Sequence, residues 1–430
     1  MTEHYDVLVV GAGPAGLAAA RAASGHHRSV AVVDAQAMPG GQVWRHDVAK
    51  RSPRAARKAI TALDKVRWLS GHTVVAGDTR TLRMESRDGA HDVTFDALVL
   101  ATGARELHLP FPGWTLPGVT GAGGLQALTK QGWPMAGKRV LVAGTGPLLL
   151  AAASSLRSHG AKVVGIVEQA PHHRVAAFAG QLWRWPARAA QAVRLKSHLA
   201  GVPCHYGAHV REAFGNDGTL QAVTVENATG MQRIPCDLLA VGYGLVPNTR
   251  LAQLLGCRLQ ENTPHPGVQV DGACRTSVAN VFAAGEICGI GGLAMARIEG
   301  TIAGHAAAGS RHDILAWNRR HARARLFADI LARTFALDPS LHNLATPDTI
   351  VCRCEDVPLA ALDGLGDLRS AKLASRCGMG ACQGRICGSA LTELGRIASP
   401  GVRPPLFPAR MESLAAAHFS STTCDHRGTS

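Results

Sequence analysis

The sequence predicts an α/β fold with two nested Rossmann-like dinucleotide-binding domains and a small α-helical module near the C-terminus. Three observations support this prediction. A glycine-rich turn joins a strand to a helix near the N-terminus, a similar unit begins 133 residues later, and five of the eleven cysteines lie between Cys352 and Cys387. The 430 residues are enough for two or three domains with a large core.

The first unit reads strand, turn, helix and strand. Segment 6–10 is largely apolar, as expected for a strand buried on both faces, and leads into Gly11-Ala-Gly-Pro-Ala-Gly16. In such a turn Gly11 permits the tight bend, Gly13 lets the backbone approach a pyrophosphate, and Gly16 lets helix and strand pack closely. Asp34 ends the next strand, where its carboxylate can accept hydrogen bonds from the ribose hydroxyls of an adenosine. The order of these parts predicts a nucleotide site.

The second unit repeats this order over residues 138–168. Its turn carries Gly144 and Gly146, and its second strand ends at Glu168. Leu149 occupies the third glycine position, where its side chain would intrude between helix and strand. Two interpretations stay open. In the first, the site binds NAD through Gly144, Gly146 and Glu168, and Glu168 repels the 2′-phosphate of NADP. In the second, the site is degenerate or serves another ligand.

Two further strands end in glycine-containing segments, Ala101-Thr102-Gly103 and Gly285-Glu286. With the first turn, they resemble the two-dinucleotide flavoproteins of the glutathione and thioredoxin reductase type, over roughly residues 4–310. That superfamily usually has Asp at position 286, so Glu286 keeps the charge and lengthens the reach. The resemblance implies FAD, with these candidate binding residues: Gly11, Gly13, Pro14, Ala15, Gly16, Asp34, Gly41, Gln42, Val75, Ala101, Thr102, Gly103, Gly285 and Glu286.

Members of that superfamily often carry a redox-active cysteine pair beside the flavin. Here the cysteines of the first 310 residues are isolated, at positions 204, 236, 257, 274 and 288. Small buried hydrophobic side chains are the better interpretation of these thiols. We therefore do not expect a disulfide reductase mechanism.

The cysteine cluster predicts a metal centre. Cys352-Arg-Cys354 precedes Cys377-Gly-Met-Gly-Ala-Cys382, with 22 residues between the two pairs. Four thiolates from two short loops suit a [2Fe–2S] cluster, and the intervening glycines let backbone N–H groups approach the sulfurs. We expect Cys352, Cys354, Cys377 and Cys382 as ligands. Cys387 is a spare thiol that either packs, which the pattern favours, or replaces one of these ligands. Zinc and free thiols remain alternatives.

These motifs resemble the bacterioferritin-associated-ferredoxin type of [2Fe–2S] module. The module occurs at the C-terminus of the large subunit of heteromeric flavin-dependent amine dehydrogenases, a family that includes the A-type subunit of opine oxidase, the B-type subunit of hydrogen cyanide synthase and the α-type subunit of D-hydroxyproline dehydrogenase. The resemblance covers nearly the whole chain, up to the proline-rich segment 403–408. One departure is a shortened segment between the cysteine pairs.

We expect the chain to divide into five parts. These are a discontinuous FAD-binding domain (1–116 and 240–312), a second dinucleotide-binding domain (117–239), a helical linker (313–345), the [2Fe–2S]-binding module (346–400) and a proline-rich tail (401–430). The tail ends in polar residues, and we expect it to be extended and partly disordered.

The net charge of +14 arises from 45 basic and 31 acidic residues. The basic residues are dispersed, which favours a general surface property or a docking face over nucleic-acid binding. Residues 178–188 combine two tryptophans with two arginines and predict either a docking site for a partner subunit or a helix that covers the second domain. No secretory signal and no transmembrane segment is expected, because the longest apolar run, 140–153, is short and interrupted.

A flavin exchanges electrons in pairs and a [2Fe–2S] cluster exchanges them singly, so both in one chain suggest an electron-transferring subunit. The resemblance implies a partner flavoprotein subunit that oxidises an amino acid, imino acid or opine, with the further option of a small ferredoxin-like subunit, and a quinone or respiratory acceptor. It also implies a cytoplasmic location, with peripheral attachment at the inner membrane left open. We find no amine-binding or proton-abstracting constellation. The alternatives are a self-contained NAD(P)H-dependent acceptor reductase and a non-catalytic scaffold with structural cofactors.

Overall fold

The computed structural model describes residues 3–216, 218–310, 314, 316–398 and 401–415. The first domain is built on a seven-stranded sheet with the order β3-β2-β1-β6-β5-β4, in which β17 also pairs with β6. Its strands are β1 (Glu3–Val10), β2 (Val30–Asp34), β3 (Arg67–Ser70), β4 (Thr73–Gly77), β5 (Thr81–Ser86), β6 (Gly89–Leu100) and β17 (Val281–Ala283). Its helices are α1 (Pro14–Ser24), α2 (Arg54–Thr61), α7 (Arg250–Leu254) and α8 (Gly292–Ala307).

Strand β1 is buried on both faces, as predicted from its apolar sequence. Val7 and Val9 pack into one hydrophobic cluster, whereas Leu8 and Val10 pack into another on the opposite face of the sheet. Successive side chains of a strand alternate between faces, so one short apolar run contributes to both clusters. The strand pairs in parallel with β2 and β6.

Helices α1 and α8 pack closely because glycines line their contact. A Cβ added at Gly300 would lie 2.1 Å from the carbonyl oxygen of Ala15, and one added at Gly304 would lie 2.2 Å from that of Ala19. No larger residue fits either position without moving the backbone. This contact fixes the N-terminus of α1 beside the ends of the strands.

The second domain repeats the Rossmann arrangement, as predicted. Its five-stranded parallel sheet has the order β11-β10-β9-β15-β8 and is followed by an antiparallel sheet, β12-β13-β14. The strands are β8 (Val119–Gly121), β9 (Arg139–Gly144), β10 (Lys162–Glu168), β11 (Cys204–Tyr206), β12 (Ala208–Asn216), β13 (Thr219–Asn227), β14 (Gly230–Pro235) and β15 (Leu238–Gly242). The helices are α3 (Ala122–Lys130), α4 (Leu148–Ser158), α5 (His172–Gln181), the 3₁₀ turn η1 (Leu182–Arg184) and α6 (Pro186–His198).

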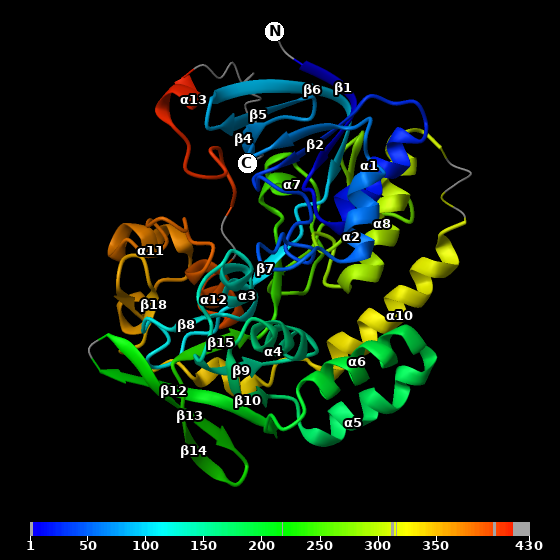
Figure 1. Cartoon of the computed structure of the whole chain (residues 1–430). Coiled ribbons are helices and arrows are strands. Elements are labelled where there is room, and N and C mark those ends of the chain that lie inside the picture. The colour runs from blue at the N-terminus through cyan, green and yellow to red at the C-terminus, as the bar shows by residue number, and fades with distance from the viewer. Residues whose placement is uncertain (1–2, 217, 311–313, 315, 399–400, 416–430) are drawn as a thin grey trace.

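The chain crosses between the domains on a two-stranded antiparallel ribbon of β7 (Ala104–Glu106) and β16 (Leu245–Pro247). Figure 1 shows the first domain above this ribbon and the second below it. The core of the second domain already includes Leu107 and Phe111, directly after β7.

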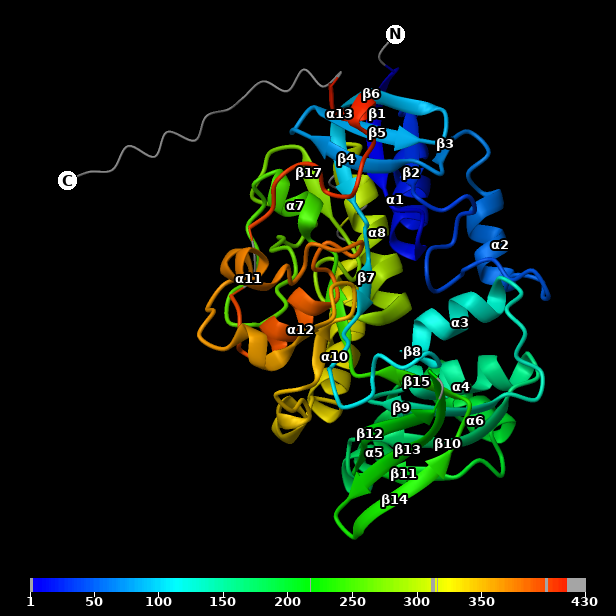
Figure 2. The same cartoon turned by 90° about the vertical axis from the view of Figure 1, so that its left-hand side faces the viewer.

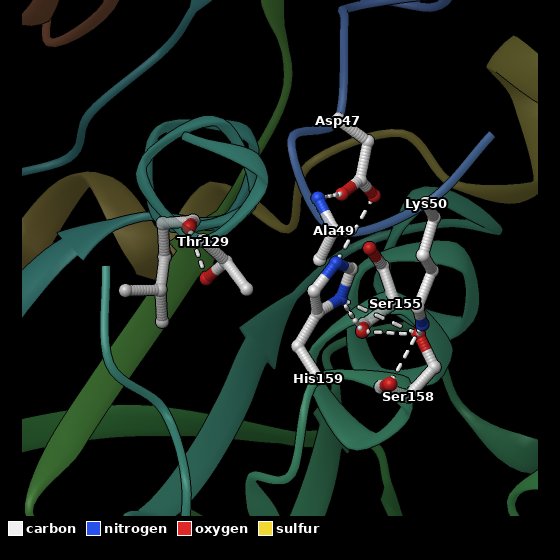
Figure 3. A network of polar contacts seen from close by, with 8 residues as sticks. Asp47, Ala49, Lys50, Thr129, Ser155, Ser158 and His159 are labelled. Carbon is white, nitrogen blue, oxygen red and sulfur yellow. Dashed lines mark hydrogen bonds and ion pairs between the residues drawn. The ribbon is translucent and has the colours of Figure 1, made fainter. Parts of the chain in front are cut away.

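A polar network ties the two domains together away from the ribbon (Figure 3). Asp47 Oδ2 lies 3.0 Å from Nε2 of His159, and Lys50 Nζ donates to Ser158 Oγ at 2.6 Å. An Asp–His–Ser group can suggest a nucleophile, but Nδ1 of His159 lies 2.8 Å from the carbonyl oxygen of Ser155 and is thereby held within its own helix turn. The network therefore acts as a clamp between the domains.

The C-terminal region returns to the first domain. A long helix, α10 (Asn318–Thr334), and the turn η2 (Pro339–Asn343) lead to a module made of β18 (Ile350–Cys352), β19 (Val357–Pro358), η3 (Leu359–Leu362), α11 (Leu368–Ser375) and α12 (Cys387–Glu393). The module has its own small core around Val351, Leu368 and Leu391. Figures 1 and 2 place it beside the ribbon and α7.

The described part of the tail packs on the first domain. Leu406 is buried, and its N–H donates to the carbonyl of Val75 at 2.7 Å. The short helix α13 (Met411–Ala415) follows. Residues 416–430, the end of the predicted disordered tail, lie outside the described residues. No helix in the described ranges is long and apolar enough to cross a bilayer.

Candidate functional site

A cavity of about 970 Å³ opens at the carboxyl ends of the parallel strands of the first domain. This is the crevice where doubly wound sheets bind nucleotides, and its volume suits a dinucleotide. Twelve of the fourteen residues predicted from the sequence line it: Gly11, Gly13, Pro14, Ala15, Asp34, Gly41, Gln42, Val75, Ala101, Thr102, Gly103 and Glu286. The other two, Gly16 and Gly285, pack behind the wall.

The glycines of the first turn differ in the space around them. A Cβ at Gly16 would lie 1.8 Å from the carbonyl oxygen of Gly11, so this position must stay bare for the helix to pack. A Cβ at Gly13 would meet nothing within 4 Å, because it would point into open space at the N-terminus of α1. The unpaired N–H groups of that terminus are suited to an anionic pyrophosphate.

Two acids shape this cavity. Asp34 accepts the N–H of Ala12 at 2.6 Å and that of Gln36 at 2.8 Å, and so holds the glycine turn in place. Burial raises the pKa of Glu286, and the nearby Glu299 raises it further. The sequence did not single out Glu299, which accepts the N–H of Gly285 at 2.9 Å. The sequence signal that could have identified Glu299 is a single acid within a helix, residues 292–307, that consists mostly of small and apolar residues.

Three arginines on the module side of the cavity were not predicted. Arg105, Arg250 and Arg385 all line it, and none has a carboxylate within ion-pair distance among the described residues. Burial, together with Arg250 and Arg385, lowers the pKa of Arg105 to about 10. Arg105 also donates to Ser389 Oγ at 2.7 Å and to the carbonyl of Arg385 at 3.2 Å. Strand β7 thus holds the module against the cavity.

An acid in the module adds a second anchor. Oε2 of Glu393 lies 2.9 Å from Nε2 of His265, which is within ion-pair distance but is not aligned for a hydrogen bond. Oε1 of Glu393 lies 3.1 Å from Nε2 of His342. Contact with His265 is the main cause that lowers the pKa of Glu393. The carboxylate therefore links the first domain, the linker and the module.

We predict that Glu393→Gln lowers the free energy of unfolding by about 1–2 kcal/mol at neutral pH. A lowered acid pKa contributes stability above the unfolded-state value, and this contribution is lost as pH falls through the folded-state value. The difference between wild type and variant should therefore shrink below pH ~4.5. Urea unfolding across this pH range measures it, and a difference that persists in acid would contradict the role of the ionised carboxylate.

Five thiols converge in the module. The sulfurs of Cys352, Cys377 and Cys387 lie within 4.8 Å of one another. Cys352, Cys354, Cys382 and Cys387 line a separate cavity of about 270 Å³, in which Cys377 has no part. The Gly378 N–H donates to the Cys352 sulfur at 3.5 Å, as expected from the glycines of this segment. The structure therefore brings together all four predicted ligands and also Cys387, the spare thiol.

The environment of Cys382 favours a thiolate. A hydrogen bond with Cys387 and the backbone N–H groups of Ile386 and Gly384 lower the pKa of Cys382 to about 4, and the same thiol contact raises that of Cys387. Thiolates are the ligands that iron–sulfur clusters and zinc require. The donor set therefore fits a metal centre.

The second glycine turn is covered by the chain itself. A Cβ at Gly146 would lie 3.7 Å from the ring of Phe335, and Thr145 Oγ1 donates to the carbonyl of Phe335 at 3.2 Å. Gln169 donates to the carbonyl of Ala336 at 2.9 Å. Glu168 is buried and accepts the N–H of Gly146 at 2.7 Å. Leu149, which we expected to intrude, is fully buried between helix and sheet. The linker after α10 thus packs where a pyrophosphate would approach.

Comparison with known proteins agrees with this arrangement. A family model described as pyridine nucleotide-disulphide oxidoreductase matches residues 5–308. The chain belongs to this family. It is therefore a flavin-dependent oxidoreductase with a Rossmann-type fold, and the family implies that the first cavity binds FAD.

Two curated relatives are similar over almost their full length. The A-type subunit of opine oxidase from Agrobacterium tumefaciens (strain Ach5) is 33% identical, over 96% of this chain and 92% of the relative. The HcnB subunit of hydrogen cyanide synthase from Pseudomonas aeruginosa is 34% identical, over 88% of this chain and 90% of the relative. Both are named as subunits of larger enzymes, which implies partner subunits for proteins of this kind.

Solved structures share the fold. L-proline dehydrogenase from P. horikoshii aligns with a TM-score of 0.69 and 19% identity, over 96% of this chain and 80% of that one. Thioredoxin reductase from T. acidophilum aligns with a TM-score of 0.55 and 24% identity, over 71% of this chain and 98% of that one. The second match covers a smaller share of this chain than the first.

Proposed function

We propose that the chain is the electron-transferring FAD and [2Fe–2S] subunit of a heteromeric amino-acid, imino-acid or opine dehydrogenase. One observation carries this proposal. The loop from Cys382 to Cys387 has Arg385 in the wall of the dinucleotide cavity and Ile386 in the wall of the thiol cavity. One short loop therefore separates the two sites, and the names of the relatives supply the class of complex.

The thiol cavity supports a particular ligand set. We propose that Cys352, Cys354, Cys382 and Cys387 hold the cluster, because these four line the cavity, and that Cys377 is the spare thiol. From the sequence we expected Cys377 as the fourth ligand and Cys387 as the spare thiol. Both give a C-x4-C pair with Cys382, so spacing alone does not separate them.

When bound, FAD exchanges electrons in pairs and a [2Fe–2S] cluster exchanges them singly, so together they couple amine oxidation to a one-electron acceptor. The chain's own residues orient and shield these groups. The N-terminus of α1 and Asp34 position the nucleotide, Arg105 holds the module in place, and the buried Cys352 and Cys387 keep water from one side of the thiol cavity. Cys354 is exposed, which gives an external partner access to the other side.

The covered second turn argues against the self-contained NAD(P)H-dependent reductase. We predict that a stoichiometric amount of NADH, added anaerobically to the purified flavin-loaded chain, leaves the visible flavin band unbleached over minutes. Phe335 and Ala336 pack against the turn that would carry the nicotinamide dinucleotide, and Glu168 faces inward. Rapid stoichiometric bleaching would instead support the self-contained enzyme.

Electron transfer from a partner tests the proposal itself. A partner flavoprotein subunit, reduced in advance and freed of reductant, is mixed anaerobically with the oxidised chain, and the signal of the reduced cluster is followed by electron paramagnetic resonance. Wild type should develop the signal, and Cys382→Ser should not. Amine oxidation with an external acceptor that survives intact in the Cys382→Ser complex would favour the scaffold alternative.

A further inference from the structure

Two segments of the second domain and linker form a strongly basic surface, here called the cationic face: residues 172–198 (α5, η1 and α6) and 318–334 (α10). Together they contain ten Arg and Lys residues and one acid, Asp329. They therefore supply nine of the chain's fourteen net positive charges from 44 of its 430 residues. In Figure 1 they lie on the side of the molecule away from α11 and α12.

The basic side chains of this face have few acidic neighbours among the described residues, of which Asp338 near Arg174 is one. Among the described residues, none of the ten has a carboxylate within ion-pair distance. Nine are exposed, and Arg188 is half-buried. Elsewhere on the surface, by contrast, Arg139 pairs with Asp237 and Arg410 pairs with Glu85.

The two segments are joined rigidly by an apolar layer underneath. Phe178 and Trp185 pack against Phe327 and Ile330, with ring centroids of Trp185 and Phe327 5.2 Å apart. Arg323 also donates to the carbonyl of Arg184 at 2.6 Å. The sequence left open whether residues 178–188 cover the domain or bind a partner. Phe178 and Trp185 cover the domain, whereas the side chain of Trp183 is exposed to solvent.

Trp183 is 77% exposed and Val193 is 69% exposed, and they stand among the basic side chains. Arg and Trp can anchor a protein interface, but charged residues are depleted at its buried core, and this face has ten basic residues and one acid. Basic residues with an exposed Trp are instead typical of segments that lie on a bilayer surface, where each cation adds attraction to anionic headgroups. We propose that the cationic face binds the surface of an anionic lipid membrane. This proposal is independent of the bound cofactors.

The test uses the full chain and large vesicles of phosphatidylcholine, alone or mixed with phosphatidylglycerol. Cosedimentation should occur only with the mixed vesicles and should weaken as salt rises from about 0.05 M to about 0.5 M. Arg319→Glu with Arg325→Glu should lower the affinity at least ~10-fold. Both side chains are exposed and have no hydrogen bond or ion pair among the described residues. Trp183→Ser should weaken binding and abolish fluorescence quenching by brominated lipid.

A matched control changes two exposed, unpaired arginines of the first domain, Arg80→Glu with Arg258→Glu. It carries the same change of charge and should reduce binding less than ~2-fold. Circular dichroism and flavin content check that all variants are folded. Equal losses in the two double variants, or no binding to anionic vesicles at low salt, would overturn the proposal. The proposal would also be overturned if the double variant Arg319→Glu with Arg325→Glu releases a partner subunit while its binding to vesicles stays unchanged.

Discussion

We expect that replacing Cys387 by Ser removes the proposed iron–sulfur centre, whereas replacing Cys377 by Ser leaves it in place. Cys387 lines the thiol cavity with Cys352, Cys354 and Cys382, while Cys377 lies outside that lining. An iron–sulfur cluster depends on its full set of thiolate ligands, so loss of one ligand should lower the iron content at least ~10-fold. Iron and sulfide analysis of the anaerobically purified variants, with electron paramagnetic resonance after reduction, measures the result.

The two cysteines are well matched for this comparison. Both are buried, both belong to the module core, and their sulfurs lie within 4.8 Å of Cys352 and of each other. A general loss of packing should therefore affect the two variants alike. The opposite result, with the cluster lost in Cys377→Ser and kept in Cys387→Ser, would restore the ligand set expected from the sequence.

A Val at position 13 abolishes FAD binding while the protein stays folded. The Cβ of this residue would meet no protein atom within 4 Å, and its backbone (φ −76°, ψ −178°) is open to any residue. The added side chain would stand where the pyrophosphate approaches the N–H groups of α1. We expect affinity for FAD to fall at least ~100-fold, or about 2.8 kcal/mol. Titration of the apoprotein with FAD and the apoprotein Tm measure the two effects.

Gly16→Val is the contrasting change in the same turn. Its Cβ would lie 1.8 Å from the backbone oxygen of Gly11, so helix and strand must separate. Overpacking of this kind typically costs about 1–3 kcal/mol or more, and the Tm should fall even without FAD. A Gly13→Val protein that retains its flavin, or that unfolds as readily as Gly16→Val, would show that the cavity is not the nucleotide site.

The fold and the first cavity could be predicted because local rules determine them. The turn at Gly11–Gly16 needs residues without a side chain, and the apolar run of β1 packs into two buried clusters. Each of these requirements can be recognised within one short segment of the sequence. Gly16 and Gly285, which we expected to bind the cofactor, do not line the cavity and pack behind its wall.

The remaining features depend on contacts between distant segments. Phe335 covers Gly146 across 189 residues, and Arg105 contacts Ser389 across 284. No periodicity or spacing in the sequence encodes such pairs. Cys377 and Cys387 stand at equal spacing from Cys382, and only the folded loops distinguish which thiol faces the cavity.

The central claim is that one chain carries both an FAD and a [2Fe–2S] cluster. Anaerobic purification of the wild-type chain, followed by quantification of flavin, iron, acid-labile sulfide and zinc on the same sample, tests it most directly. We expect one FAD, two iron and two sulfide per chain, with a rhombic signal of a reduced cluster after dithionite. Stoichiometric zinc without sulfide, or a chain that binds no flavin when FAD is supplied, would contradict it.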